Sequence, residues 1–132
     1  MEIQQQTRFN ILVSQCVFAY ALLVVGLAIL MPILLAMNVG EFIENLIGGG
    51  IGFFLVKHIR EGDQKMLALA ILYFAVQLVN INYGDLSLGL SFGVMISVAF
   101  NVDEVSVGIN VLSVILTGMT AVAWLKNKPK KY

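Results

Sequence analysis

The composition of this 132-residue chain excludes an ordinary soluble domain. Hydrophobic residues make up 59% of the chain and charged residues 12%, whereas soluble domains contain about half and about a quarter. A globule this small cannot bury so much apolar surface, so a lipid bilayer is the solvent that the chain requires. Eight basic and eight acidic residues leave no net charge, and no basic patch indicates nucleic-acid binding.

The first apolar segment, residues 11–37, is long enough to cross a bilayer, for which about 20 apolar residues suffice. It is also longer than the apolar part of a signal peptide, which has about 7–15 residues, so we interpret it as a retained membrane helix. Pro32 removes a backbone donor within it and predicts a kink or a helix end near residues 28–32.

A second helix is expected at residues 42–58, although three consecutive glycines interrupt its apolar sequence. Membrane helices accept glycine where two backbones approach closely, and Glu44, Gly48 and Gly52 fall on one helical face. Glu44 is a candidate functional carboxylate if it lies within the membrane, and a simple interfacial residue if it does not. The charged residues 57–65 that follow are expected to form a loop.

The third helix is expected at residues 66–82, where Gln77 and Asn80 lie on a polar stripe. Two further apolar segments, residues 86–102 and 105–125, precede a basic tail at 126–132. Small residues spaced by four favour a packed helix in the first of them. A polar series at steps of three and four favours a helix in the second. The small residues are Gly89, Gly93 and Ser97, and the polar series is Ser106, Asn110, Ser113, Thr117 and Thr120.

The same region also contains a short internal repeat. Residues 86–92 match residues 105–111, and each copy follows an acidic residue. Both copies alternate apolar with small or polar residues, which is the period of a strand. A hairpin that turns at Asp103-Glu104 is therefore the alternative to the two helices. The repeat is either a chance match in a sequence of low diversity or a duplicated structural unit.

The basic residues predict the orientation in the membrane, because Lys and Arg accumulate on the cytoplasmic side. Arg8, the segment 57–65 and the tail hold all eight of them. They reach one side together only if residues 86–102 enter and leave on the outer side as a re-entrant segment. The expected fold is thus an all-α, single-domain bundle of four transmembrane helices plus this segment, with five spans as the alternative. Both termini are expected in the cytoplasm, and the membrane is expected to be a bacterial inner membrane.

The sequence offers little for catalysis. Cys16 and His58 are the only cysteine and histidine, so neither a zinc site of cysteines and histidines nor a cofactor is expected. The polar stripes must turn away from lipid, where they either pack helices together or line a water path. The candidate pore or packing residues are Glu44, Gly48, Gly52, Gln77, Asn80, Gly89, Gly93, Ser97, Ser106, Asn110, Ser113, Thr117 and Thr120.

The function expected from these features is that of a non-enzymatic membrane subunit. Such a subunit would self-associate or join a larger membrane complex, and would form or regulate a pore or transport path. One alternative is a small immunity or exclusion protein that binds another membrane protein. The other is a lipid-modifying enzyme that uses the acidic residues.

Overall fold

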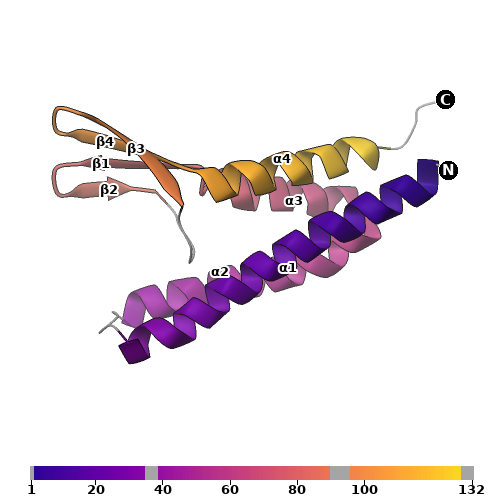
Figure 1. The fold of residues 1–132 in the computed structure, drawn as a ribbon, viewed down its shortest axis with the longest axis horizontal. Coiled ribbons are helices and arrows are strands. Elements are labelled where there is room, and N and C mark those ends of the chain that lie inside the picture. Colours follow the sequence, from indigo (N-terminus) through magenta and orange to yellow (C-terminus); the bar gives the residue numbers. More distant parts are fainter. Residues whose placement is uncertain (1, 35–38, 90–95, 129–132) are drawn as a thin grey trace.

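The structure, a computed structural model, describes residues 2–34, 39–89 and 96–128. Two long helices, α1 (Glu2–Leu34) and α2 (Val39–Glu61), lie side by side, and two shorter helices, α3 (Gln64–Ala75) and α4 (Val111–Lys126), form a second pair (Figure 1). An antiparallel sheet extends from α3 and α4, away from the two chain termini (Figure 1). Its strands are β1 (Val79–Tyr83), β2 (Leu86–Leu88), β3 (Ser97–Val102) and β4 (Val105–Asn110).

The mostly helical architecture agrees with the expectation from the sequence, but the all-α class is wrong. Among the described residues, α1 and α2 are long and apolar enough to cross a membrane. They rise about 50 and about 35 Å. The helix end expected near residues 28–32 comes slightly later, because α1 continues through Pro32 to Leu34.

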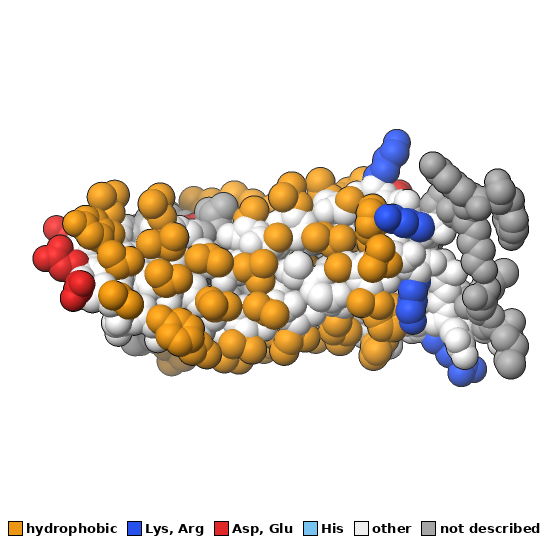
Figure 2. All heavy atoms as spheres, turned by 90° about the horizontal axis from the view of Figure 1, so that it is seen from above, with side chains coloured by type: hydrophobic (Ala, Val, Ile, Leu, Met, Phe, Trp, Pro, Cys, Tyr) orange, Lys and Arg blue, Asp and Glu red, His pale blue; other side chains and the backbone are white. Residues whose placement is uncertain are grey.

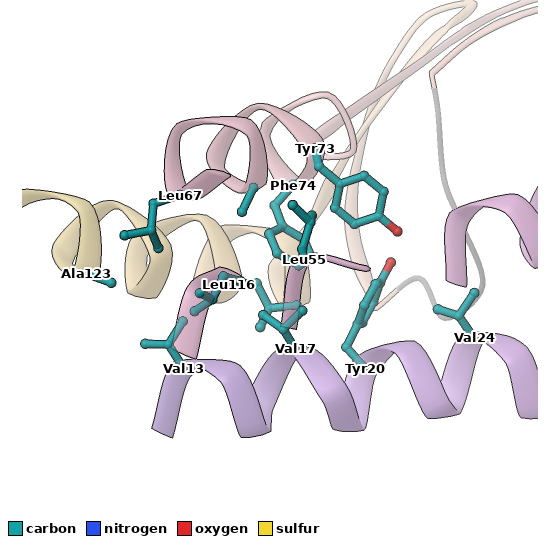
Figure 3. Packing of buried hydrophobic residues seen from close by; sticks show 12 residues of the cluster. Val13, Val17, Tyr20, Val24, Leu55, Leu67, Tyr73, Phe74, Leu116 and Ala123 are labelled. Atoms are coloured by element: carbon teal, nitrogen blue, oxygen red, sulfur yellow. The ribbon is translucent and has the colours of Figure 1, made fainter. Parts of the chain in front are cut away.

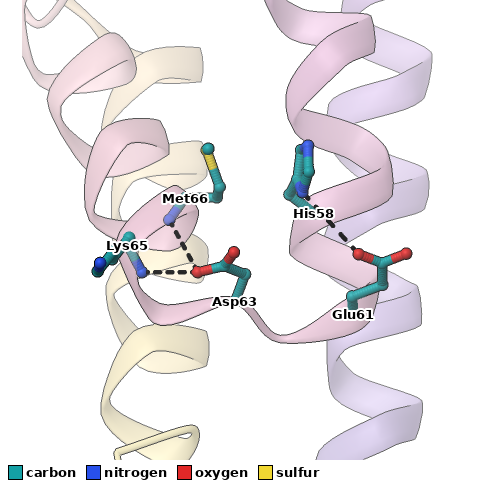
Figure 4. A network of polar contacts seen from close by, with 5 residues as sticks. All are labelled: His58, Glu61, Asp63, Lys65 and Met66. Atoms are coloured by element: carbon teal, nitrogen blue, oxygen red, sulfur yellow. Dashed lines mark hydrogen bonds and ion pairs between the residues drawn. The ribbon is translucent and has the colours of Figure 1, made fainter.

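The connection between α2 and α3 is much shorter than the expected loop at residues 57–65. α2 continues to Glu61, and Gly62 then adopts a φ of +73°, which favours glycine and ends the helix. The amides of Gly62 and Asp63 donate to the carbonyls of Ile59 and His58 at 3.1 and 3.2 Å. The Asp63 carboxylate then accepts from the first amides of α3 (Figure 4). Only two residues therefore separate the helices.

The third and fourth segments are each half helix and half strand. α3 rises about 18 Å, which is too short for a hydrocarbon core of about 30 Å. Followed by β1, it extends to about 35 Å, and β4 followed by α4 extends further. The helix expected over residues 66–82 ends at Ala75, and the described parts of residues 86–102 contain strands, not the expected helix. The helix expected at 105–125 begins only at Val111.

The sheet consists of two hairpins with two-residue turns, at Gly84-Asp85 and at Asp103-Glu104. The first residue of each turn has a φ of 54°, as the tight turns of hairpins require. The hairpin at Asp103-Glu104, the alternative in the sequence, is thus the arrangement that forms. Both turns lie at the end of the molecule away from the termini (Figure 1). Leu86 and Val102 accordingly lie at the same end of the sheet, each in a strand.

The hydrophobic core lies where the two helix pairs meet (Figure 3). α1 contributes one face, with positions spaced by four, three and four, and the other three helices pack against it. The buried residues are Val13, Val17, Tyr20 and Val24 from α1, Leu55 and Ile59 from α2, Leu67, Ala70, Tyr73 and Phe74 from α3, and Leu116 and Ala123 from α4. The outward faces of α1 and α2 expose large apolar side chains such as Leu22, Leu23 and Ile47.

Candidate functional site

A buried chain of polar groups connects three helices in the core. The Tyr20 hydroxyl donates to Gln77 Oε1 at 2.8 Å, and Gln77 Nε2 donates to the Tyr73 carbonyl at 3.0 Å. The Tyr73 hydroxyl donates to the Gly48 carbonyl of α2 at 2.6 Å. In an apolar interior such groups must find partners inside the protein. The polar stripe in the sequence included Gln77, but nothing in the sequence pointed to Tyr20 as its partner.

The glycines of α2 allow a close approach to α1. Gly48, Gly49 and Gly52 are buried, and a Cβ at Gly52 would lie 3.0 Å from the Cβ of Ala21. Gly50, one residue from Gly49, faces open space. The predicted glycine face thus lies at a helix contact, while Glu44 is exposed near the start of α2.

The polar series from Ser106 to Thr120 divides between a strand and a helix. Ser106 lies on β4, and Asn110 caps α4 by accepting from the Ser113 amide. Ser113 and Thr120 are fully buried within the chain, and Thr120 donates to the Leu116 carbonyl at 2.8 Å. Ser113 Oγ and Thr117 Oγ1 are buried with no hydrogen-bond partner among the described residues. This part of the series points into the bundle.

The sheet has two faces of opposite chemistry, because successive side chains alternate. Pairing of the strands places like residues in rows across it. The apolar face consists of Val79, Ile81, Tyr83, Leu86, Leu88, Val98, Phe100, Val102, Val105, Val107 and Ile109. The polar face consists of Asn80, Asn82, Gly89, Ala99, Asn101, Ser106 and Gly108.

The exposure along β1 is the reverse of that expected for a strand in a soluble sheet. On the central strand β1, Val79, Ile81 and Tyr83 are 46, 39 and 55% exposed, whereas Asn80 and Asn82 between them are half-buried. A soluble sheet turns its apolar face to the core and its polar face to water. The apolar face therefore requires an apolar environment that the described part of the chain does not provide.

Gly89, directly after β2, and Gly108 on β4 both lie beside Asn80. A Cβ at Gly89 would lie 2.5 Å from Asn80 Oδ1 and 3.0 Å from its Cα, so the asparagine occupies the space that a side chain would need. Asn80 Oδ1 is buried without a partner among the described residues. Gly89 thus has a role in the sheet, not in the predicted helix contact with Gly93 and Ser97. Ser97 pairs with Asn110, and Gly93 lies outside the described residues.

Basic side chains gather at one end of the long axis. Figure 2 shows Lys and Arg at this end and a cluster of Asp and Glu at the other, with hydrophobic side chains covering the face between them. Glu61 and Asp63, at the α2–α3 turn, are acidic residues at the basic end. The basic end combines the start of α1, the α2–α3 turn and the end of α4, where Asn10 and Asn127 exchange hydrogen bonds. Lys128 lies 4.0 Å above the Trp124 ring at this end.

The remaining candidates for chemistry are isolated. His58 lies 3.9 Å from Glu61 near the end of α2 (Figure 4), and Cys16 is half-buried in α1. Within residues 2–34, 39–89 and 96–128, no group of three His, Cys, Asp or Glu residues is placed to hold a metal ion. The candidate functional surfaces are therefore the sheet and the charged ends.

Comparisons with protein-family models, with curated proteins and with solved structures find no match to the chain.

Proposed function

We propose that this chain is a non-enzymatic integral membrane subunit that associates with other copies of itself and forms or regulates a polar path across the membrane. The observation that carries the proposal is the exposure along β1, where the apolar residues are more exposed than the polar residues between them. Alternation of lipid-facing and water-facing residues is typical of sheets within membranes. The exposed apolar faces of α1 and α2 require the same solvent.

Charge at the two ends supports a transmembrane orientation. Six of the basic residues belong to the described part of the chain and gather at the end that holds both termini: Arg8, Lys57, Arg60, Lys65, Lys126 and Lys128. The opposite end carries both hairpin turns with Asp85, Asp103 and Glu104. Because basic residues favour the cytoplasm, the basic end lies inside and the hairpin turns lie outside.

The polar face of the sheet is the better candidate for a water path than the helical stripes. Gln77, Ser113 and Thr120 are buried inside one chain, so association of chains would leave them away from any shared lumen. Asn82 and Asn101 lie on the polar face, and Asn101 is exposed. Rows of amides and hydroxyls provide the hydrogen bonds that water or a polar solute needs in a membrane.

A flux experiment tests the proposed path. The protein is reconstituted in lipid vesicles, its mass is measured, and the leakage of small polar solutes of graded size is recorded. Asn82→Leu should reduce the leakage while insertion and assembly persist, and Ile81→Leu, one residue away on the apolar face, should not. A monomer without leakage would contradict the proposal and favour an immunity or exclusion protein that binds another membrane protein.

Labelling with a membrane-impermeant thiol reagent tests the orientation. In a Cys16→Ser background, Asp85→Cys and Asp103→Cys should react from outside intact cells, and Lys128→Cys only after lysis. Labelling of position 128 from outside would contradict the proposed orientation. Labelling of all three positions in intact cells would contradict membrane insertion of the sheet and helices as one unit.

A further inference from the structure

The sheet is built by repetition of one hairpin. Residues 79–89 and 98–108 correspond position by position in strand, turn and strand. The strand order β2-β1-β4-β3 places the first strand of one hairpin, β1, beside the second strand of the other, β4. The hairpins are thus related by a step along the sheet, and the contact between β1 and β4 is the contact between successive repeats.

The two edges of the sheet are a first and a second strand of the repeated hairpin. β3, the first strand of its hairpin, has no neighbouring strand on its outer side among the described residues. β2, the second strand of the other hairpin, forms the opposite edge. The six residues of β3 include no charge and no proline, the usual devices that prevent edge pairing. In a hydrocarbon environment, an open edge with unpaired amides and carbonyls is costly and does not occur facing lipid.

We propose that β3 of one chain pairs with β2 of a second copy of the same chain, in the way that β1 pairs with β4 within the chain. This inference rests on the proposed function, because it assumes that the sheet lies in the membrane. Tyr83 pairs with Val105 in the internal contact, so Val102 pairs with Leu86 of the second copy. Asn82 pairs with Ser106, so Asn101 pairs with Ser87 of the second copy.

The chemistry of the rows continues across this contact. Ile81 pairs with Val107 within the chain, and the corresponding pair between copies is Phe100 with Leu88 of the second copy. The apolar face therefore continues across the contact with apolar residues. The polar face continues through Asn101. Repetition of the step in one direction forms a head-to-tail series, which closes into a ring when the rotation between copies permits. A closed ring leaves no edge and encloses the polar face, as in membrane barrels.

The direction of the strands favours this contact over pairing of β3 with itself. Copies inserted in the same orientation carry their β3 strands in the same direction. A two-fold axis along the membrane normal would place the amides of one β3 opposite the amides of the other, so the two strands could not form a regular hydrogen-bonded pair. β3 and β2 run in opposite directions within the chain, so β3 of one copy and β2 of the next form a regular antiparallel pair.

Disulfide cross-linking tests the pairing. Leu88 and Phe100 lie in one row at opposite edges of the sheet, about 14 Å apart, so they cannot join within a chain. In a Cys16→Ser background in vesicles, Leu88→Cys/Phe100→Cys should form covalent dimers and higher species after oxidation. The matched control, Leu88→Cys/Asn101→Cys, places the second thiol on the other face and should not.

Single variants separate the head-to-tail contact from its rivals. Leu88→Cys alone and Phe100→Cys alone should stay monomeric in denaturing gels, and their co-expressed mixture should give dimers only. Dimers from Phe100→Cys alone would overturn the proposal in favour of β3 pairing with β3. If the Phe100 variants fail to insert, Leu86→Cys/Val102→Cys tests the next row.

The outcomes also distinguish this inference from the proposed function. An assembly that leaks polar solutes but forms no cross-link at either row would overturn the strand pairing alone. A monomer that neither leaks nor cross-links would overturn both.

Discussion

The contact between α1 and α2 depends on Gly49, and the adjacent Gly50, which faces open space, provides a matched control. A Cβ at Gly49 would overlap Val25 Cγ2 and lie 3.5 Å from Val24 Cγ1, whereas a Cβ at Gly50 would meet nothing within 4 Å. Valine is stiff at χ1, so Val25 cannot turn aside freely. Extra volume in a packed contact costs about 1–3 kcal/mol.

We expect Gly49→Ala to be less stable than Gly50→Ala by about 1–3 kcal/mol. Both substitutions change helix propensity equally, so the difference between them isolates the packing. Unfolding in mixed detergent and SDS micelles, followed by the fluorescence of Trp124, the only tryptophan, measures it. In the double variant Gly49→Ala/Val25→Ala the overlap is removed, so the two substitutions should couple favourably. Equal unfolding midpoints for the two alanine variants would refute the contact.

Substitutions at three further positions test individual structural features by the same titration. Tyr20→Phe removes the donor to Gln77 and should cost about 1–3 kcal/mol; no change would mean that the bond does not form. Asn110→Ala removes the cap of α4 and should cost about 0.5–2 kcal/mol, with recovery in Asn110→Ser; equal stability of the two variants would contradict the cap. Asp103→Gly should stabilise the second turn, and Asp103→Val should destabilise it by about 1–2 kcal/mol, because its φ is positive; the opposite order would contradict the turn.

The boundaries of the long helices could be predicted only in part, because charge marks the edge of the membrane and not the end of a helix. Residues 57–61 are charged or polar in part, yet α2 continues through them. A helix that leaves the hydrocarbon remains hydrogen-bonded internally and simply acquires polar side chains. The better signal was Gly62-Asp63, a residue suited to ending a helix followed by a residue suited to starting one.

The strands were misread because a spacing of four does not distinguish a helix from a strand. Gly89, Gly93 and Ser97 share a face in either structure, since four is a multiple of the strand period and close to one helical turn. Ser106 and Asn110 have the same ambiguity. The internal repeat contained the decisive information, because each copy begins directly after a pair of turn residues. The strands that precede the two turns differ too much in sequence for the repeat to be recognised in them.

The polar residues of the helices and those of the sheet have different roles, because a helix and a sheet present their side chains differently. A helical stripe such as Ser113, Thr117 and Thr120 can be covered by neighbouring helices. Thr120 also donates its hydroxyl hydrogen bond to a carbonyl of its own helix. A sheet separates its residues into two faces, and the described helices pack at the end of this sheet and do not cover either face. Substitutions in the stripe should therefore act through stability, whereas substitutions on the polar face should act through whatever contacts that face. The sheet is the part of this small chain whose chemistry remains directed outward after the helices have packed.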